Sequence, residues 1–236
     1  MRKEALSPEG RRVYEVLMSK RDYSLPYHEL FCMTDPEMLE RYDQFYSALT
    51  LAGRALDDKT KELVWAAILI ASREAEGTLH LRRGLRCGLT PEEYGEAVQL
   101  TVLAEGSGAL EFVHRHWEAD YLNRPGTAAL YADMLTRAFA GSRLEPGVRE
   151  LILIGTYTAL ERPEGLALHI IRAKAAGVSD RAIGEAMSYV MIPKGANTLI
   201  RGVEVWIHLI KEGKVEPGPE LAGWSDLTGP VGGIKA

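Results

Sequence analysis

The chain has 236 residues, of which 46% are hydrophobic and 26% charged, so it can bury one large core or two smaller ones and is not predicted to be disordered. A net charge of -5 and a pI of about 5.8 exclude the basic surface that nucleic-acid or membrane binding requires. Small molecules and other proteins are the expected partners.

The N-terminal segment, residues 1–34, is predicted to add a helix after Ser7-Pro8 and an irregular stretch around Leu25-Pro26-Tyr27. Its opening residues, MRKEALSPEGRR, lack the apolar core of a signal peptide. No run in the chain approaches the roughly 18 apolar residues that span a bilayer. We therefore expect a cytoplasmic protein.

An internal repeat follows this segment. Residues 36–117 and 125–206 align with a shift of 89, apart from one short stretch with a shift of 88. Each copy is 82 residues long. Matched residues include Pro36 and Pro125, Tyr42 and Tyr131, Gly88 and Gly177, Gly95-Glu96-Ala97 and Gly184-Glu185-Ala186, and Trp117 and Trp206.

The signals that begin and end elements within the copies are helical. Asp35-Pro36 supplies an N-cap before a proline at the first helical position. Thr90-Pro91-Glu92-Glu93 supplies a capping box after Gly88 has ended the preceding helix. The apolar runs at 63–72 and 151–160 are too long for ordinary strands, so we predict buried helices and an all-α fold.

Each long helix is predicted to end in a turn and to be followed by a second helix. Pro163 forces the break in the second copy, and Glu76-Gly77 marks the corresponding turn in the first. Beyond the repeats, residues 212–236 are rich in Gly and Pro and are predicted to form an extended arm.

Both copies place an acid, an arginine, a histidine and a second arginine around this turn. Buried acids need a partner, which favours a functional role for the two glutamates. Alternatively, both glutamates lie in exposed first turns and stabilise the helix dipole. The residues are Glu62, Arg73, His80 and Arg83 in the first copy, and Glu150, Arg162, His169 and Arg172 in the second.

The two histidines follow the turn, where an imidazole can point into the gap between helices. A pKa near 6.5 suits proton transfer, although a hydrogen-bonded core histidine is the alternative. Glu76 lies four residues before His80 and is predicted to share its helical face and fix its tautomer. Arg83 and Arg172 either lie on a solvated face or bind a substrate carboxylate through two hydrogen bonds.

Cys32 and Cys87 lie in different contexts, and the sequence has no CxxC, HExxH or Cys/His zinc spacing. We therefore expect no disulfide, no bound metal and no cofactor. Each cysteine is expected to be a small buried hydrophobic residue.

Residues 76–93, E-x-x-x-H-L-R-R-G-L-R-C-G-L-T-P-E-E, resemble the gamma-carboxymuconolactone decarboxylase pattern of an acid, a histidine, a glycine and a Thr-x-Glu-Glu helix start. PKGANTL (193–199) resembles the glycine-containing segment before that family's last helix. The resemblance to the carboxymuconolactone decarboxylase superfamily covers 36–117 and 125–206. It implies an all-α fold built from two such units.

The alkylhydroperoxidase D-like branch of this superfamily has a glutamate, then Cys-x-x-Cys, then a histidine four residues later. In that alignment the cysteine positions are Arg73 and Glu76 in the first copy, and Arg162 and Gly165 in the second. Thiol peroxidase chemistry needs a thiolate and a resolving thiol, so the alignment argues against that activity.

The resemblance implies a cofactor-independent decarboxylase or isomerase that acts on a small carboxylated lactone or oxo acid. His80 or His169 would be the acid/base, oriented by Glu62, Glu150 or Glu76, and the arginines Arg73, Arg83, Arg162 and Arg172 would bind the anionic substrate. Because the decarboxylases form rings of six single copies, two copies per chain imply a trimer with a pseudo-hexameric ring. The alternative is a non-catalytic binding or scaffold protein of the same fold.

Overall fold

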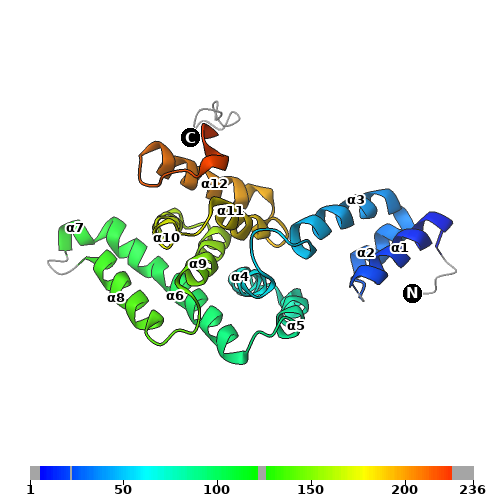
Figure 1. The fold of residues 1–236 in the computed structure, drawn as a ribbon, viewed down its shortest axis with the longest axis horizontal. Helices are drawn as coiled ribbons and strands as arrows, with labels where there is room; N and C mark the ends of the chain where they lie inside the picture. Colours follow the sequence, from blue (N-terminus) through cyan, green and yellow to red (C-terminus); the bar gives the residue numbers. More distant parts are fainter. Residues whose placement is uncertain (1–5, 22, 122–125, 225–236) are drawn as a thin grey trace. The chain divides into compact units, whose positions relative to one another are not determined.

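The computed structural model describes residues 6–21, 23–121 and 126–224, and every regular element in these ranges is a helix, as the sequence predicts (Figure 1). The expected caps are present: Asp35 accepts a hydrogen bond from the Met38 N–H at 3.1 Å, and Thr90 and Glu93 form a reciprocal capping box. The elements are α1 (Pro8–Arg21), α2 (Pro26–Thr34), α3 (Pro36–Tyr46), the π-helix η2 (Ser47–Leu51), α4 (Asp58–Ala71), the short η3 (Ala75–Gly77), α5 (Thr78–Arg86), α6 (Pro91–His116), α7 (Glu118–Tyr121), α8 (Thr127–Phe139), α9 (Pro146–Leu160), α10 (Pro163–Ala175), α11 (Asp180–Ser188), η4 (Tyr189–Met191), α12 (Ala196–Lys211) and η5 (Pro219–Leu221).

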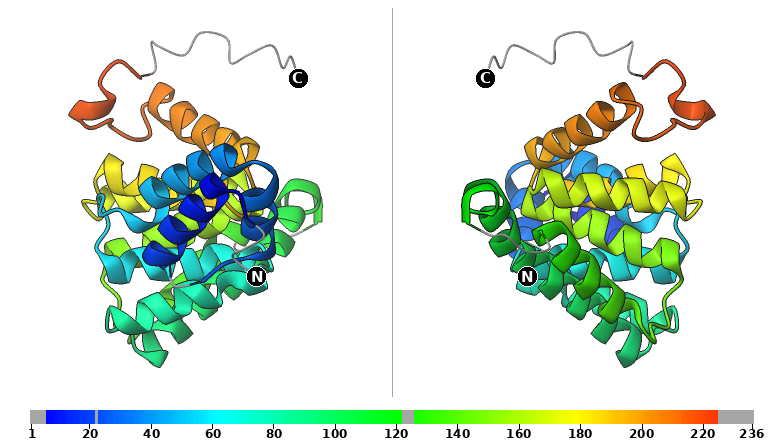
Figure 2. Two further views of the ribbon diagram at one scale, coloured as in Figure 1. Left: turned by 90° about the vertical axis from the view of Figure 1, so that its right-hand side faces the viewer. Right: turned by 90° about the vertical axis from the view of Figure 1, so that its left-hand side faces the viewer.

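The chain divides into two compact units, Met1–Ala52 and Gly53–Ala236. In the first unit α1, α2 and α3 pack together around Leu17, Cys32 and Leu39. α3 opens the first repeat of the sequence, so the boundary between the units falls inside that repeat. α8, which corresponds to α3 in the second repeat, belongs to the second unit and packs against α6 (Figure 2).

The two long apolar runs form α4 and α9, which pack against each other at the centre of the second unit (Figure 1). Every residue is buried from Thr60 to Leu69 and from Glu150 to Ala159. A helix enclosed on all sides needs apolar residues on every face, which explains the continuous runs in the sequence. Gly155 lies where the helices meet, and a Cβ there would be 2.9 Å from Val64 Cγ1.

The repeats hold each other through a reciprocal contact. Glu185 of α11 accepts hydrogen bonds from the N–H groups of Ala55 at 2.5 Å and Leu56 at 3.1 Å, in the loop before α4. Glu96 of α6 accepts one from the Arg143 N–H at 2.9 Å, in the loop before α9. Each repeat thereby fixes the loop that leads into the central helix of the other.

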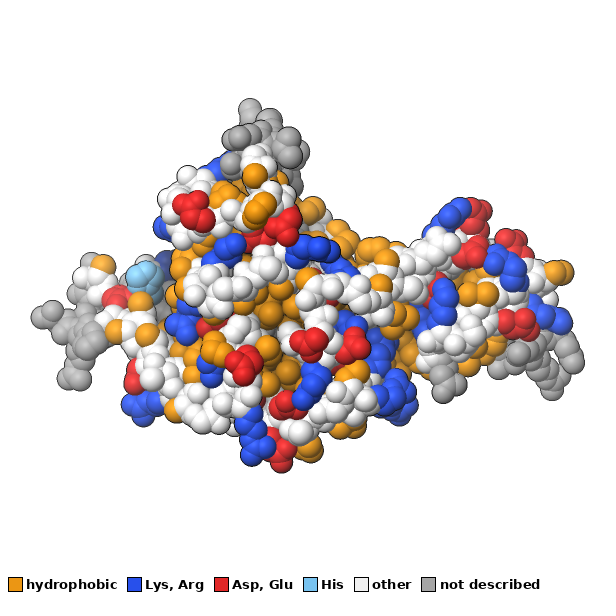
Figure 3. All heavy atoms as spheres, in the orientation of Figure 1, with side chains coloured by type: hydrophobic (Ala, Val, Ile, Leu, Met, Phe, Trp, Pro, Cys, Tyr) orange, Lys and Arg blue, Asp and Glu red, His pale blue; other side chains and the backbone are white. Residues whose placement is uncertain are grey.

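The segment predicted as a C-terminal arm is described only as far as Trp224. α12 ends at Lys211, directly before this segment, and η5 forms a single turn within it, whereas residues 225–236 lie outside the described ranges. None of the helices described has the length and hydropathy needed to cross a bilayer. Acidic and basic side chains are interspersed over the face drawn in Figure 3.

Candidate active site

The second repeat brings its predicted glutamate and histidine together in the core. Glu150 lies near the start of α9, and His169 lies in α10, which begins at Pro163 directly after the turn. His169 Nδ1 and Glu150 Oε2 are 2.6 Å apart, and the two residues are only 0% and 4% exposed. Arg172 donates from Nε to the other carboxylate oxygen at 2.9 Å. Glu150 is therefore a buried, paired carboxylate and does not lie in an exposed first turn.

This pairing fixes where the imidazole of His169 carries its proton. Burial lowers the pKa of His169, and the hydrogen bond and charge of Glu150 oppose that effect only in part. The ring is therefore neutral at pH 7. Because a carboxylate can only accept hydrogen bonds, the ring proton sits on Nδ1 and Nε2 is left as an acceptor.

Hydroxyl groups continue the network from Nε2. The Tyr131 hydroxyl lies 3.0 Å from His169 Nε2, and the Tyr157 hydroxyl lies 2.6 Å from that of Tyr131 and 2.8 Å from Ser107 Oγ. The Tyr157 ring also stacks on the imidazole, with centroids 5.2 Å apart. Burial raises the pKa of both tyrosines, so both hydroxyls are protonated at neutral pH.

The network ends at a cavity of about 630 Å³, which we call the tyrosine cavity. Burial raises the pKa of Glu111 at its wall. Arg115 and Glu164 form an ion pair of 2.9 Å, in which both side chains are more than half exposed. The cavity is lined by Ser107, Leu110, Glu111, His114, Arg115, Thr127, Ala128, Tyr131, Tyr157, Glu164, Gly165 and Leu168.

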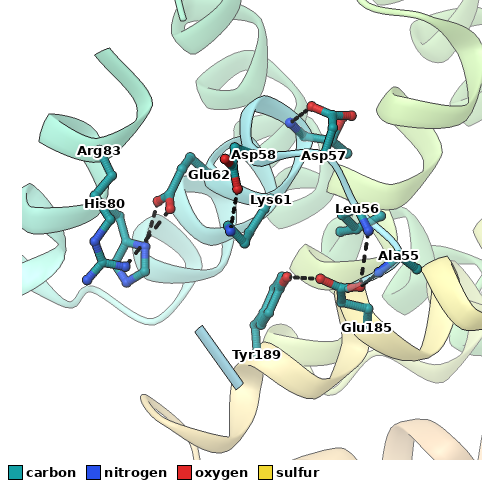
Figure 4. Close-up of polar contacts among 11 residues, drawn as sticks. Ala55, Leu56, Asp57, Asp58, Lys61, Glu62, His80, Arg83, Glu185 and Tyr189 are labelled. Carbon is teal, nitrogen blue, oxygen red and sulfur yellow. Dashed lines mark hydrogen bonds and ion pairs between the residues drawn. The ribbon is translucent and has the colours of Figure 1, made fainter. Parts of the chain in front are cut away.

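The first repeat contains a corresponding pair, shown in Figure 4. His80 Nδ1 lies 2.8 Å from Glu62 Oε2, and Arg83 Nη1 lies 4.0 Å from the other carboxylate oxygen. Glu62 is 1% exposed, and burial lowers the pKa of His80. The carboxylate at His80 is thus that of Glu62, whereas Glu76 lies exposed in η3, so the contact expected between Glu76 and His80 is corrected.

The two pairs differ in their surroundings. His80 stacks at 4.2 Å on Trp65, whose indole Nε1 is buried without a hydrogen-bond partner among the described residues. Seven residues after Glu62 the chain has Leu69, whereas seven residues after Glu150 it has Tyr157. The first repeat therefore has no tyrosine at the position that corresponds to Tyr157.

Arg73 and Arg162 lie at the turns and contact neither histidine pair. Arg73 has a positive φ of 57° and forms an ion pair with Glu105 at 2.6 Å. Arg162 donates to the carbonyl oxygens of Ala104 and Glu105, both at 2.7 Å. Both arginines are therefore used to hold α6 against the turns.

No cluster of three His, Cys, Asp or Glu side chains in the described parts of the chain could bind a metal ion. Both cysteines are unpaired thiols, with Cys32 buried and Cys87 half-buried. The residues that converge on the tyrosine cavity are suited to moving protons.

Three residues of this network were not predicted, namely Tyr131, Tyr157 and Ser107. Tyr131 carried a usable signal, because it matches Tyr42 in the aligned repeats. Tyr157 and Ser107 have no such match, and in the sequence each looks like an ordinary residue of a long helix. Only the packing of α6, α8 and α9 brings them together.

Gly165 stands at one of the positions that the alignment assigns to a peroxidase cysteine, and no side chain fits there. A Cβ would lie 2.0 Å from Tyr157 Cε1. We expect Gly165→Ala to lower the free energy of unfolding by about 2 kcal/mol, because the Tyr157 ring must move off His169. Urea titration measures this loss. Gly184→Ala is the control, since a Cβ there meets its nearest neighbour only at 3.8 Å; equal stability of the two variants would contradict the prediction.

The comparisons agree with the internal repeat. The model of the "Carboxymuconolactone decarboxylase family" matches residues 36–117 and again 125–207. The chain is similar in fold to the crystal structure of a candidate gamma-carboxymuconolactone decarboxylase subunit from Burkholderia xenovorans LB400, with a TM-score of 0.58, 18% identity, and coverage of 87% of this chain and 99% of that one. No curated protein gives a significant match. The predicted all-α tandem repeat is confirmed.

Proposed function

The chain belongs to the carboxymuconolactone decarboxylase family, and on this premise we propose that it is a cofactor-independent decarboxylase or isomerase acting on a small carboxylated lactone or oxo acid. The observation that carries the proposal is the buried Glu150–His169 pair, whose hydrogen-bond network ends at the tyrosine cavity. A cavity of about 630 Å³ has the size of a small-molecule site.

The proposed chemistry needs an electron sink in the substrate and a proton carrier in the protein. When a carboxylate or proton leaves the carbon beside a carbonyl, the electron pair enters that carbonyl, and a proton must then return to the enolate. His169 is a neutral imidazole that can carry such a proton, and Glu150 orients it and stabilises its charged form.

Arg115 is the proposed binding group for the substrate carboxylate. It lines the cavity and forms an exposed ion pair with Glu164, and such pairs contribute at most about 1 kcal/mol. Turning Arg115 from Glu164 to a substrate carboxylate therefore costs little free energy. Arg172 is bonded to Glu150, and we assign it the role of keeping that carboxylate in place.

Assembly is part of the same proposal. Two family units in one chain would give a pseudo-hexameric ring in a trimer, and the similar crystal structure is itself described as a subunit. Sedimentation or light scattering measures the number of chains.

The test measures turnover of 2-oxo acids, 3-oxo acids and 5-oxotetrahydrofuran carboxylates, with CO₂ release reporting decarboxylation and NMR in D₂O reporting proton exchange. We expect His169→Gln, folded as judged by circular dichroism, to lower kcat/KM at least about 100-fold, the usual contribution of acid–base catalysis. The matched variant His80→Gln measures how much the first repeat contributes to kcat/KM. Tight binding without turnover by the wild-type protein would instead identify a non-catalytic binding protein.

A further inference from the structure

His169 is separated from the tyrosine cavity by tyrosine side chains. The histidine is 0% exposed and is not part of the cavity wall, whereas Tyr131 and Tyr157 are. One face of the imidazole is covered by the Tyr157 ring, with planes 22° apart, and Nε2 is covered by the Tyr131 hydroxyl at 3.0 Å. A substrate in the cavity would therefore meet tyrosine before it met histidine.

The direction of the hydrogen bonds gives Tyr131 a specific task. Glu150 holds the proton of His169 on Nδ1, so Nε2 can only accept, and the Tyr131 hydroxyl must donate to it. The Tyr131 oxygen in turn accepts from the Tyr157 hydroxyl at 2.6 Å. A second donor at this distance stabilises negative charge on the Tyr131 oxygen.

We propose that the Tyr131 hydroxyl is the catalytic group that exchanges a proton with the substrate, and that Glu150 and His169 act through it. The inference rests on the proposed function and deepens it by naming the reacting atom. It also places the reaction in the second repeat, because the hydroxyl of Tyr42, the counterpart of Tyr131, accepts a hydrogen bond from the Tyr27 hydroxyl at 3.1 Å in the first unit.

The proton balance is complete in both reactions. In isomerisation, the substrate C–H bond breaks, its proton goes to the Tyr131 oxygen, the Tyr131 proton passes to His169 Nε2, and the C–H electron pair enters the carbonyl. The reverse transfers return a proton to a different carbon. In decarboxylation, the C–C bond to the carboxylate breaks, its electron pair enters the carbonyl, and CO₂ leaves. Tyr131 then protonates the carbon that carried the carboxylate, and a solvent proton restores the Tyr131 hydroxyl.

The buried position of Tyr131 suits this task. Burial raises its pKa, so at neutral pH the phenol remains protonated and can give its proton to an enolate. Removing a substrate proton is possible because the phenol proton moves to His169 in the same step. The imidazolium formed is held by the Glu150 carboxylate at 2.6 Å.

The test compares Tyr131→Phe with the matched change Tyr42→Phe in the full-length protein. With the substrate classes named above, we expect Tyr131→Phe to lower kcat about 100-fold or more while the affinity for a substrate carboxylate, measured by calorimetry, changes less than about threefold. Tyr42→Phe should keep the wild-type kcat. A full rate in Tyr131→Phe, beside a loss in His169→Gln, would overturn this inference and leave the proposed function standing.

A second substitution guards against misfolding of Tyr131→Phe. Incorporation of 3-fluorotyrosine at position 131 keeps the hydroxyl and its hydrogen bonds but makes the phenol more acidic. We expect the alkaline limb of the kcat profile to move to lower pH, and an unmoved profile would overturn the inference. If the wild-type protein turned over none of the substrate classes, the proposed function and this inference would both fall.

Discussion

Glu150→Gln is expected to lower kcat on the order of 10³-fold while leaving the protein folded. Removing the carboxylate that orients the histidine of a Ser-His-Asp triad lowers kcat about 10⁴-fold, because the imidazole adopts the wrong tautomer. The same cause operates here. The expected loss of kcat therefore depends on which nitrogen of the His169 ring carries the proton.

The neighbouring arginine dictates how the new amide must orient. Arg172 Nε donates to one oxygen of Glu150 at 2.9 Å, so the glutamine carbonyl has to face Arg172. The glutamine NH₂ then faces His169 Nδ1, which must give up its proton to accept. The ring proton moves to Nε2 and points at the Tyr131 oxygen, so Tyr131 can no longer pass its proton to His169.

Steady-state kinetics and ¹⁵N NMR of the histidine ring measure the two consequences separately. The NMR signals should report protonation on Nε2 in Glu150→Gln and on Nδ1 in the wild type. Glu62→Gln makes the same change beside His80 and should cost less in rate, because the hydrogen-bond network that reaches the tyrosine cavity starts from the Glu150–His169 pair. A tautomer shift without a loss of rate would contradict a catalytic role for the Glu150–His169 pair.

Glu185→Ala is expected to lower the free energy of unfolding by about 3 kcal/mol, the larger of the stability effects predicted for this protein. The carboxylate is 2% exposed and accepts from the Leu56 N–H at 3.1 Å and the Tyr189 hydroxyl at 2.5 Å. Both partners are buried, and each buried donor left without an acceptor costs about 1–3 kcal/mol. The Ala55 N–H also loses its acceptor, but that residue is exposed and can bond to water.

Denaturant titration of matched variants tests this explanation. Glu96→Ala removes the reciprocal contact with the exposed Arg143 N–H and the half-buried Ser142 hydroxyl. Neither partner is fully buried, so the loss should be only about 1 kcal/mol. Glu185→Gln keeps one side-chain oxygen that can accept from the loop before α4, so it should lose only about half as much free energy of unfolding as Glu185→Ala. Equal losses in Glu185→Ala and Glu96→Ala would show that burial of the partners is not the cause.

The sequence by itself determined the repeat and the helices, and it singled out the two Glu and the two His positions as candidate site residues. Caps such as Thr90 and breaks such as Pro163 act within one turn of chain, so their effect is visible in a short window. The continuous apolar runs required enclosed helices. Recurrence of Glu62 and Glu150, and of His80 and His169, identified positions without needing any knowledge of contacts.

The tertiary structure alone decided which groups touch. Spacing along a helix favoured Glu76 as the partner of His80, but Glu76 lies outside α5 and the buried partner is Glu62, 18 residues earlier. The Tyr131–His169 bond joins residues 38 apart. Such contacts depend on how whole helices rotate and cross, which local patterns do not encode. The reacting hydroxyl that we propose therefore became visible only after the packing of α6, α8 and α9 was known.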